Sequence, residues 1–145
     1  MSVSGSGFPV ASAGQSAWTN YQVSADIKTN PTDGHARVIA RHQSDSYFYA
    51  CGLDHAENGE PAKLFLGKLY NGTWYTFATT PYTFSATAWY HIDFAVQGDD
   101  LYCQVTDTTG SHTVLHVVET YFPAGGIGAT GEHAEFDNFV VRPLP

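Results

Sequence analysis

The clearest structural signal in the chain is the segment Trp89-Tyr90-His91-Ile92-Asp93-Phe94-Ala95-Val96-Gln97-Gly98-Asp99-Asp100-Leu101-Tyr102-Cys103-Gln104-Val105. Its apolar and polar side chains alternate on both sides of a Gly-Asp-Asp turn. Because successive side chains of a β-strand point to opposite faces, this alternation predicts a half-buried antiparallel hairpin. The residues expected to face the core are Tyr90, Ile92, Phe94, Val96, Leu101, Cys103 and Val105. The other face is a candidate binding surface, because it carries large or hydrogen-bonding groups: Trp89, His91, Asp93, Tyr102 and Gln104.

Other parts of the chain show the same alternation in short segments. Turn signals such as Asn30-Pro31-Thr32-Asp33-Gly34 and Asn71-Gly72 separate them, and Asn-Gly favours a type I′ hairpin turn. The expected strands are residues 21–28, 35–41, 47–53, 63–70, 74–79, 89–97, 101–105, 112–118, 125–130 and 134–141. No long segment holds a helical period. Many short strands with frequent turns predict an all-β fold, a two-sheet antiparallel β-sandwich.

The last expected strand contains a change of phase. Ala134 and Phe136 occupy even positions, whereas Phe139 and Val141 occupy odd ones. If both pairs face the core, one extra residue must lie between them, which predicts a β-bulge near Asp137-Asn138. A bulge leaves backbone carbonyls free, so the carboxylate there either binds an ion or caps the bulge through backbone amides.

Length and composition narrow the function classes. The 145 residues fit one domain, for which we expect a tail or linker over residues 1–14 and a single β-sandwich over residues 15–145. Charged residues make up only 14% of the chain, against roughly 25% in typical globular proteins. This composition is common in secreted β-proteins that handle neutral polymers. The net charge of −8 argues against nucleic acid and anionic membranes as partners.

The start of the chain and its cysteines bear on the compartment. Residues 1–7 do not resemble a signal peptide and look like a trimmed linker, as in a module taken from a larger secreted protein. Cys51 and Cys103 fall in separate expected strands, and they form either a disulfide or two buried thiols. His112 and His116 are four apart on an expected strand, roughly 13 Å, which is too far to chelate one ion.

A set of motifs in a fixed order extends from about Trp18 to Arg142. These motifs are Gly34-His35-Ala36-Arg37-Val38-Ile39-Ala40-Arg41, Ser46-Tyr47-Phe48-Tyr49, Trp89-Tyr90, Val96-Gln97-Gly98, Gly125-Gly126-Ile127-Gly128 and Phe136-Asp137-Asn138-Phe139-Val140-Val141. Together they resemble the concanavalin A-like, laminin G-like jelly-roll superfamily. The resemblance implies two curved sheets, with saccharides bound on the concave face or at the loop edge. Many relatives are non-catalytic carbohydrate-binding modules attached to glycoside hydrolases or polysaccharide lyases. Many also carry a structural calcium ion held by the closing-strand aspartate, here Asp137.

Sugar binding needs flat apolar rings and fixed hydrogen-bond donors, which Tyr, Trp and Arg supply. Arg37 and Arg41 are expected to point the same way, with Val38 and Ala40 facing the core. The other candidate ligand-binding residues are Tyr47, Tyr49, Trp74, Tyr75, Trp89, His91, Asp93, Tyr102 and Gln104. For each ring alone, packing in the sheet or core is the simpler explanation. The hypothesis is that a subset of these residues forms one exposed patch.

Catalysis is the less favoured interpretation. Glycoside hydrolysis needs two carboxylates roughly 5–10 Å apart, and the Glu-x-Asp-x-x-Glu motif of laminarinase-like relatives does not occur in the chain. The residue types of a polysaccharide lyase are present, but the lyase strand motifs are missing. The sequence therefore predicts a secreted, non-catalytic, lectin-like module that recognises a polysaccharide or oligosaccharide during polysaccharide degradation. The alternatives are a small lyase or hydrolase of this fold and a protein-binding adhesion module.

Overall fold

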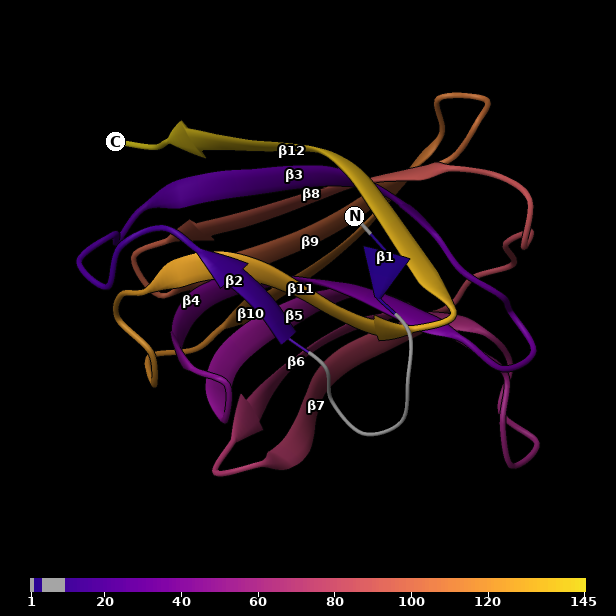
Figure 1. Ribbon diagram of the computed structural model, residues 1–145, viewed down its shortest axis with the longest axis horizontal. Helices are drawn as coiled ribbons and strands as arrows, with labels where there is room; N and C mark the ends of the chain where they lie inside the picture. The colour runs from indigo at the N-terminus through magenta and orange to yellow at the C-terminus, as the bar shows by residue number, and fades with distance from the viewer. Residues whose placement is uncertain (1, 4–9) are drawn as a thin grey trace.

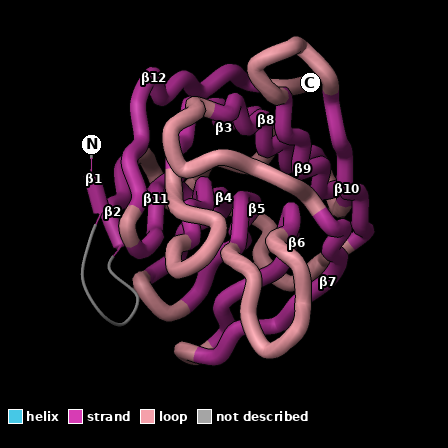
Figure 2. The backbone as a smooth tube through the Cα atoms, turned by 90° about the vertical axis from the view of Figure 1, so that its right-hand side faces the viewer, coloured by secondary structure: helices cyan, strands magenta, loops and turns pink. Residues whose placement is uncertain are grey.

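The structure is a computed structural model that describes residues 2–3 and 10–145. The strands are β1 (Ser2–Val3), β2 (Val10–Ala13), β3 (Tyr21–Lys28), β4 (His35–Ser44), β5 (Tyr47–Asp54), β6 (Lys63–Tyr70), β7 (Thr73–Pro81), β8 (Tyr90–Gln97), β9 (Asp100–Thr106), β10 (His112–Val118), β11 (Gly126–Glu132) and β12 (Ala134–Pro143). Figure 2 shows strands and loops but no helix among the described residues. In this part of the chain there is accordingly no helix with the length and apolar character needed to cross a membrane.

The strands form two six-stranded antiparallel sheets. Sheet A has the order β1-β12-β3-β8-β9-β10, and sheet B has the order β2-β11-β4-β5-β6-β7 (Figure 1). Inward-facing side chains from both sheets make one hydrophobic core between them. The prediction of an all-β, two-sheet jelly roll is confirmed.

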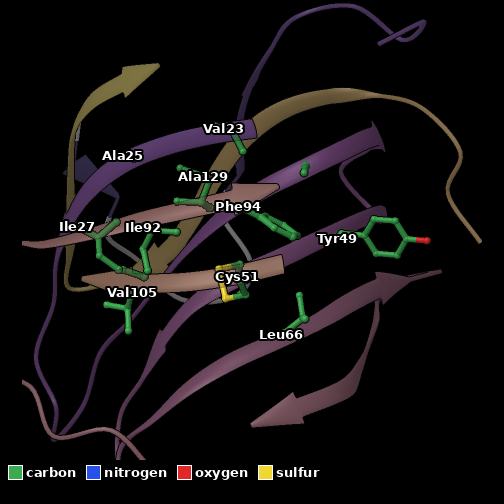
Figure 3. Close-up of a cluster of buried hydrophobic side chains, with 14 of the residues drawn as sticks. Val23, Ala25, Ile27, Tyr49, Cys51, Leu66, Ile92, Phe94, Val105 and Ala129 are labelled. Carbon is green, nitrogen blue, oxygen red and sulfur yellow. A yellow bond between two sulfur atoms is a disulfide. The ribbon is translucent and has the colours of Figure 1, made fainter. Parts of the chain in front are cut away.

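The predicted hairpin is strands β8 and β9. Gln97 pairs with Asp100, so a two-residue turn joins the strands, and Gly98 has a φ of 57° that favours glycine. All seven residues predicted to face the core are buried. Figure 3 shows Ile92, Phe94 and Val105 from this hairpin in the core with Val23 and Ala25 of the neighbouring strand.

A disulfide between Cys51 and Cys103 ties the two sheets together. Cys51 lies in β5 of sheet B and Cys103 in β9 of sheet A, with 5.5 Å between their Cα atoms (Figure 3). Both residues are fully buried. Of the two alternatives left open by the sequence, the structure therefore shows the disulfide.

The closing strand contains the predicted bulge. The register between β12 and β3 shifts between Asp137 and Val140, and Asn138 has a φ of 55°. Phe136 is buried before the shift, and Phe139 and Val141 pack against the same core after it. One inserted residue thus keeps both halves of the strand facing inward.

The predicted tail is only partly a tail. Residues 10–13 form β2, which pairs antiparallel with β11, so the boundary expected at residue 15 is wrong for these four positions. Ser2 and Val3 form β1 and pair with β12. The other residues of the predicted tail segment up to position 9, namely 1 and 4–9, lie outside the described residues.

Candidate functional site

The predicted ligand-binding residues do not share one surface. They are divided among the interior, the outer face of sheet A and the outer face of sheet B. The candidates therefore form separate groups, and Arg37 and Arg41 do not lie on one face as expected.

Arg41 is an interior residue, although Arg37 and Arg41 were expected on one face. The register between β4 and β5 shifts between Ala40 and Ser44, and Arg41 has a φ of 48°, which turns its side chain inward. Its residue is only 2% exposed, and its guanidinium donates hydrogen bonds to the carbonyls of Thr19 and Phe122. Arg41 holds loops against the core, so the structure removes it from the ligand-binding candidates.

Tyr49 is also inside, and Tyr47 is half-buried against the core. The Tyr49 hydroxyl accepts a hydrogen bond of 2.8 Å from the backbone N–H of Phe122. Burial raises the pKa of Tyr49 to about 12. Tyr49 is therefore a core residue as well, and its predicted role in ligand binding is not compatible with its position.

The outer face of sheet A carries the predicted hairpin residues, but they bind one another. Asp93 accepts hydrogen bonds from Gln22, Ser24 and Gln104. Its Oδ1 also lies 3.1 Å from Nε2 of His91. The polar groups on this face are therefore largely satisfied within the protein.

His91 lies between two carboxylates. Its Nδ1 is 2.8 Å from Asp26 Oδ1, and its Nε2 is hydrogen-bonded to Asp93. Burial lowers the pKa of His91, but the hydrogen bonds and charges of Asp26 and Asp93 outweigh burial and raise it above its ordinary value. When protonated, both ring nitrogens donate to these carboxylates, so the ring has no free lone pair to act as a base.

Tyr102 and Trp89 on the same face contact neighbouring side chains. Tyr102 stacks on His116 with 4.4 Å between ring centroids, and His116 is paired with Asp100. The Lys28 ammonium lies 5.5 Å from the centroid of the Trp89 ring.

The outer face of sheet B contains a pocket, which we call the Arg37 pocket. It is a cavity of about 310 Å³. Strands β4, β5, β6 and β7 and the loop after β5 supply its walls, which are His35, Arg37, Asp54, His55, Glu57, Lys63, Phe65, Trp74 and Thr76. Of the predicted binding residues, the structure brings Arg37 and Trp74 together here.

A glycine in the middle strand lets the pocket form. Gly52 of β5 is paired with Arg37 on one side and with Phe65 on the other. Since Gly52 has no side chain, the Arg37 side chain can cross β5 and reach the Phe65 ring. A Cβ at this position would overlap the backbone of Ala36, so a larger residue would force the strands apart.

Arg37 is held in one orientation. Its Nε and Nη2 donate hydrogen bonds of 2.9 and 2.7 Å to the two carboxylate oxygens of Asp54. Its Cζ lies 4.0 Å from the centroid of Phe65 and 4.3 Å from that of Trp74. No other hydrogen bond of this guanidinium occurs among the described residues, so its Nη1 donors are available to a ligand.

His35 adds a second polar group to the pocket. Its Nε2 is buried and has no hydrogen-bond partner in the described part of the chain. Burial, and then the positive charge of Arg37, lower the pKa of His35 below its ordinary value. The ring is therefore neutral near pH 7, and it contributes a wall of the pocket.

Sequence reasoning missed most of this pocket. Asp54 directly follows the expected strand 47–53 and is not among the candidate residues, yet it is the backbone partner of His35 in the β4–β5 ladder, and His35 is two positions from Arg37. Counting back from the turn at residues 44–46 would have paired Asp54 with Arg37 itself, whereas the register shift between Ala40 and Ser44 makes Gly52 the partner of Arg37. Phe65 carries no such signal, because alternation in β6 does not reveal which face is hollow.

The predicted calcium ligand Asp137 lies at the bulge in β12. Asp137 is exposed, and its Oδ1 accepts a 2.8 Å hydrogen bond from the backbone N–H of Asn138. No group of three or more His, Cys, Asp or Glu side chains in residues 2–3 and 10–145 is arranged to hold a metal ion. The hydrogen bond matches the capping interpretation of this residue, and calcium binding by Asp137 stays a prediction.

No protein-family model matches the chain, and no curated protein is significantly similar to it in sequence. Its structure resembles the carbohydrate binding module CBM66 from Bacillus subtilis, with a TM-score of 0.76 and 17% identity over 95% of this chain and 83% of that one. A toad ovary galectin solved in complex with thio-digalactose matches with a TM-score of 0.67 and 13% identity, over 95% of this chain and all (100%) of the galectin. The Bacteroides ovatus xyloglucan PUL GH43B matches with a TM-score of 0.66 and 16% identity, over 93% of this chain but only 29% of that one. These similarities, together with the two antiparallel sheets, show that the chain has the concanavalin A-like jelly-roll fold.

Proposed function

We propose that the protein is a non-catalytic carbohydrate-binding module and that the Arg37 pocket binds the saccharide. The observation that carries this proposal is the fixed Arg37 guanidinium, clamped by Asp54 and lying against the rings of Phe65 and Trp74. Fixed donors beside an apolar wall suit a sugar, which presents hydroxyl groups at its edge and C–H groups on its faces.

The size and charge of the pocket define the ligand further. At about 310 Å³, the cavity is at the lower end of the range of small-molecule sites, roughly 300–1,000 Å³. Its cations Arg37 and Lys63 are matched by the carboxylates of Asp54 and Glu57. We therefore infer a neutral saccharide, of which a short stretch enters the pocket.

The similar structures support the same class of ligand, since they include a carbohydrate binding module and a galectin in complex with thio-digalactose. The match to a small part of a GH43 protein supports attachment to a larger carbohydrate-active enzyme. The buried disulfide supports secretion, because disulfides persist in oxidising compartments.

Binding explains the pocket better than catalysis does. A glycosidase needs a carboxyl group that can donate a proton, but Asp54 is held by both oxygens in its pair with Arg37. Glu57 is paired with His55 at 3.1 Å. Neither carboxylate is positioned as a free acid.

Affinity electrophoresis in gels that contain xyloglucan, xylan or galactan tests the proposal. We expect at least one polymer to retard the protein without release of reducing ends or unsaturated products. Arg37→Met should weaken retardation at least about tenfold, because a hydrogen bond to a charged group contributes about 1.5–3 kcal/mol. Arg142→Met is the matched control and should not change it.

A milder pair of variants separates binding from folding. Lys63→Gln removes a charge at the wall of the pocket, whereas Lys28→Gln removes one from sheet A. Only Lys63→Gln should weaken retardation. If Arg37→Met and Lys63→Gln both bind polymer as the native protein does, the proposed site is wrong. Release of sugar products would establish an enzyme. Co-purification with a protein partner, without binding to any polymer, would favour an adhesion module.

A further inference from the structure

A second group of aromatic side chains lies at the end of sheet B where β6 turns into β7, and we call it the tyrosine cluster. Its members are Tyr47, Tyr70, Tyr75 and Tyr121. Tyr47 and Tyr70 are partners in the β5–β6 ladder, and their ring centroids are 5.4 Å apart. The Tyr70 centroid also lies 6.3 Å from Tyr75 and 4.9 Å from Tyr121. The described lining of the Arg37 pocket includes none of the four.

Two of these rings are open to solvent. Tyr75 is 47% exposed and Tyr121 is 51% exposed, although both touch Tyr70. Contiguous exposed aromatic rings usually mark a binding surface.

The Lys68 ammonium lies against the rings of the cluster and determines which ligands these rings can accept. Its Nζ is 4.2 Å from the Tyr121 centroid and 5.8 Å from the Tyr75 centroid. The same ammonium lies 3.9 Å from the Glu119 carboxylate, and the two side chains are only 15% and 19% exposed. The cation position among the rings is thus already filled, and its charge is balanced.

This arrangement selects among ligand classes. A cationic ligand would compete with Lys68 for the same rings, and an anionic ligand would meet Glu119 beside Lys68. A neutral ligand with a flat apolar face can lie on the exposed rings, and its hydroxyl groups can bond to the tyrosine hydroxyls. A pyranose ring has both properties.

We propose that the tyrosine cluster is a second saccharide-binding site, separate from the Arg37 pocket. This inference rests on the proposed function, since it assigns a further contact with the same kind of polymer. Two sites on one rigid domain would bind one polysaccharide chain or two neighbouring chains with higher avidity than either site alone.

Aromatic-ring NMR of the intact protein, titrated with xyloglucan, xylan and galactan oligosaccharides, reads the two sites separately. Signals of the Tyr75 and Tyr121 rings report on the cluster, and the Trp74 indole signal reports on the Arg37 pocket. We expect both sets to shift with the oligosaccharide of the polymer that retards the protein. In Tyr75→Ala/Tyr121→Ala, Trp74 should still shift, and the calorimetric stoichiometry should fall from about two sugars per chain to about one.

Val114→Ala/Val118→Ala is the matched control, because these valines are 50% and 69% exposed on sheet A. It should leave stoichiometry and polymer affinity unchanged, whereas the tyrosine variant should lower polymer affinity about 10²-fold. If Trp74 shifts while both tyrosine rings do not, the second site is wrong and the proposed function stands. If no signal shifts with any oligosaccharide, both fail. Tyrosine shifts that follow protein concentration instead of sugar would show self-association and overturn the second site.

Discussion

Removal of the disulfide between the sheets should destabilise the protein by a calculable amount. Cys51 and Cys103 are 52 positions apart, so the bond closes a loop of that length in the unfolded chain. The loop-closure entropy for this length corresponds to about 4 kcal/mol at 25 °C. For a domain of this size, such a loss lowers Tm by about 10 °C or more.

Equilibrium unfolding in urea measures the effect. The comparison is between the native protein, the native protein under a reductant, and Cys51→Ala/Cys103→Ala. The reduced protein keeps both buried sulfur atoms, so it separates the cross-link from the packing. We expect the free energy of unfolding to fall by about 4 kcal/mol in the reduced protein, and somewhat more in the double variant because two small cavities are added.

The slope of the unfolding curve gives an independent readout. A chain without the cross-link expands further when it unfolds, so the dependence on urea should become steeper. A loss below about 1 kcal/mol in the reduced protein would refute the reasoning. A full loss in the double variant alone would assign the stability to packing of the sulfur atoms.

Three further predictions follow from buried or paired polar groups. Arg37→Leu should lower the free energy of unfolding by about 3–5 kcal/mol, because it leaves the Asp54 carboxylate, whose side chain is 12% exposed, without its partner. In urea unfolding, Arg37→Leu/Asp54→Leu should recover most of this loss. If the double variant recovers no stability, the pairing argument is contradicted. Tyr21→Phe should lower the free energy of unfolding by about 1–3 kcal/mol, since the Tyr21 hydroxyl accepts a 2.6 Å hydrogen bond from the buried N–H of Arg41. An unchanged urea midpoint would show that water replaces the lost hydroxyl as the acceptor. The raised pKa of His91 means that its protonated form stabilises the fold fully below its unfolded pKa of about 6.5, and that this contribution disappears as pH rises through the folded pKa. The stability difference between native protein and His91→Gln should therefore shrink from pH 5 to pH 9, and a constant difference would disprove this linkage.

The sequence predicted those features of the fold that a local pattern of residues determines. Alternation around the turn at Gly98 predicted both faces of the β8–β9 hairpin, and the phase change between Phe136 and Phe139 predicted the bulge in β12. Each signal lies within a few residues, and burial enforces it directly. The same local logic predicted the Asn71-Gly72 turn, where both residues have positive φ.

The sequence did not predict features that depend on contacts between residues far apart in the chain. The register shift in β4 after Ala40 leaves no change of phase in the pattern of apolar residues. The residue that turns into the core there is Arg41, a polar residue whose guanidinium binds loop carbonyls. The outward faces were predicted for single strands, but their division between two sheets was not. For this reason Arg37 and Trp74 were grouped with Trp89, which lies on the other sheet.

The positions of the lysines have a practical consequence for handling this protein. The chain has three lysines: Lys63 lines the Arg37 pocket, Lys68 supports the tyrosine cluster, and Lys28 lies beside Trp89. Amine-reactive coupling to a sensor chip, a bead or a dye would therefore modify side chains at both proposed sites. Surface attachment should instead use an added C-terminal tag, or immobilisation itself would abolish the binding that it is meant to measure.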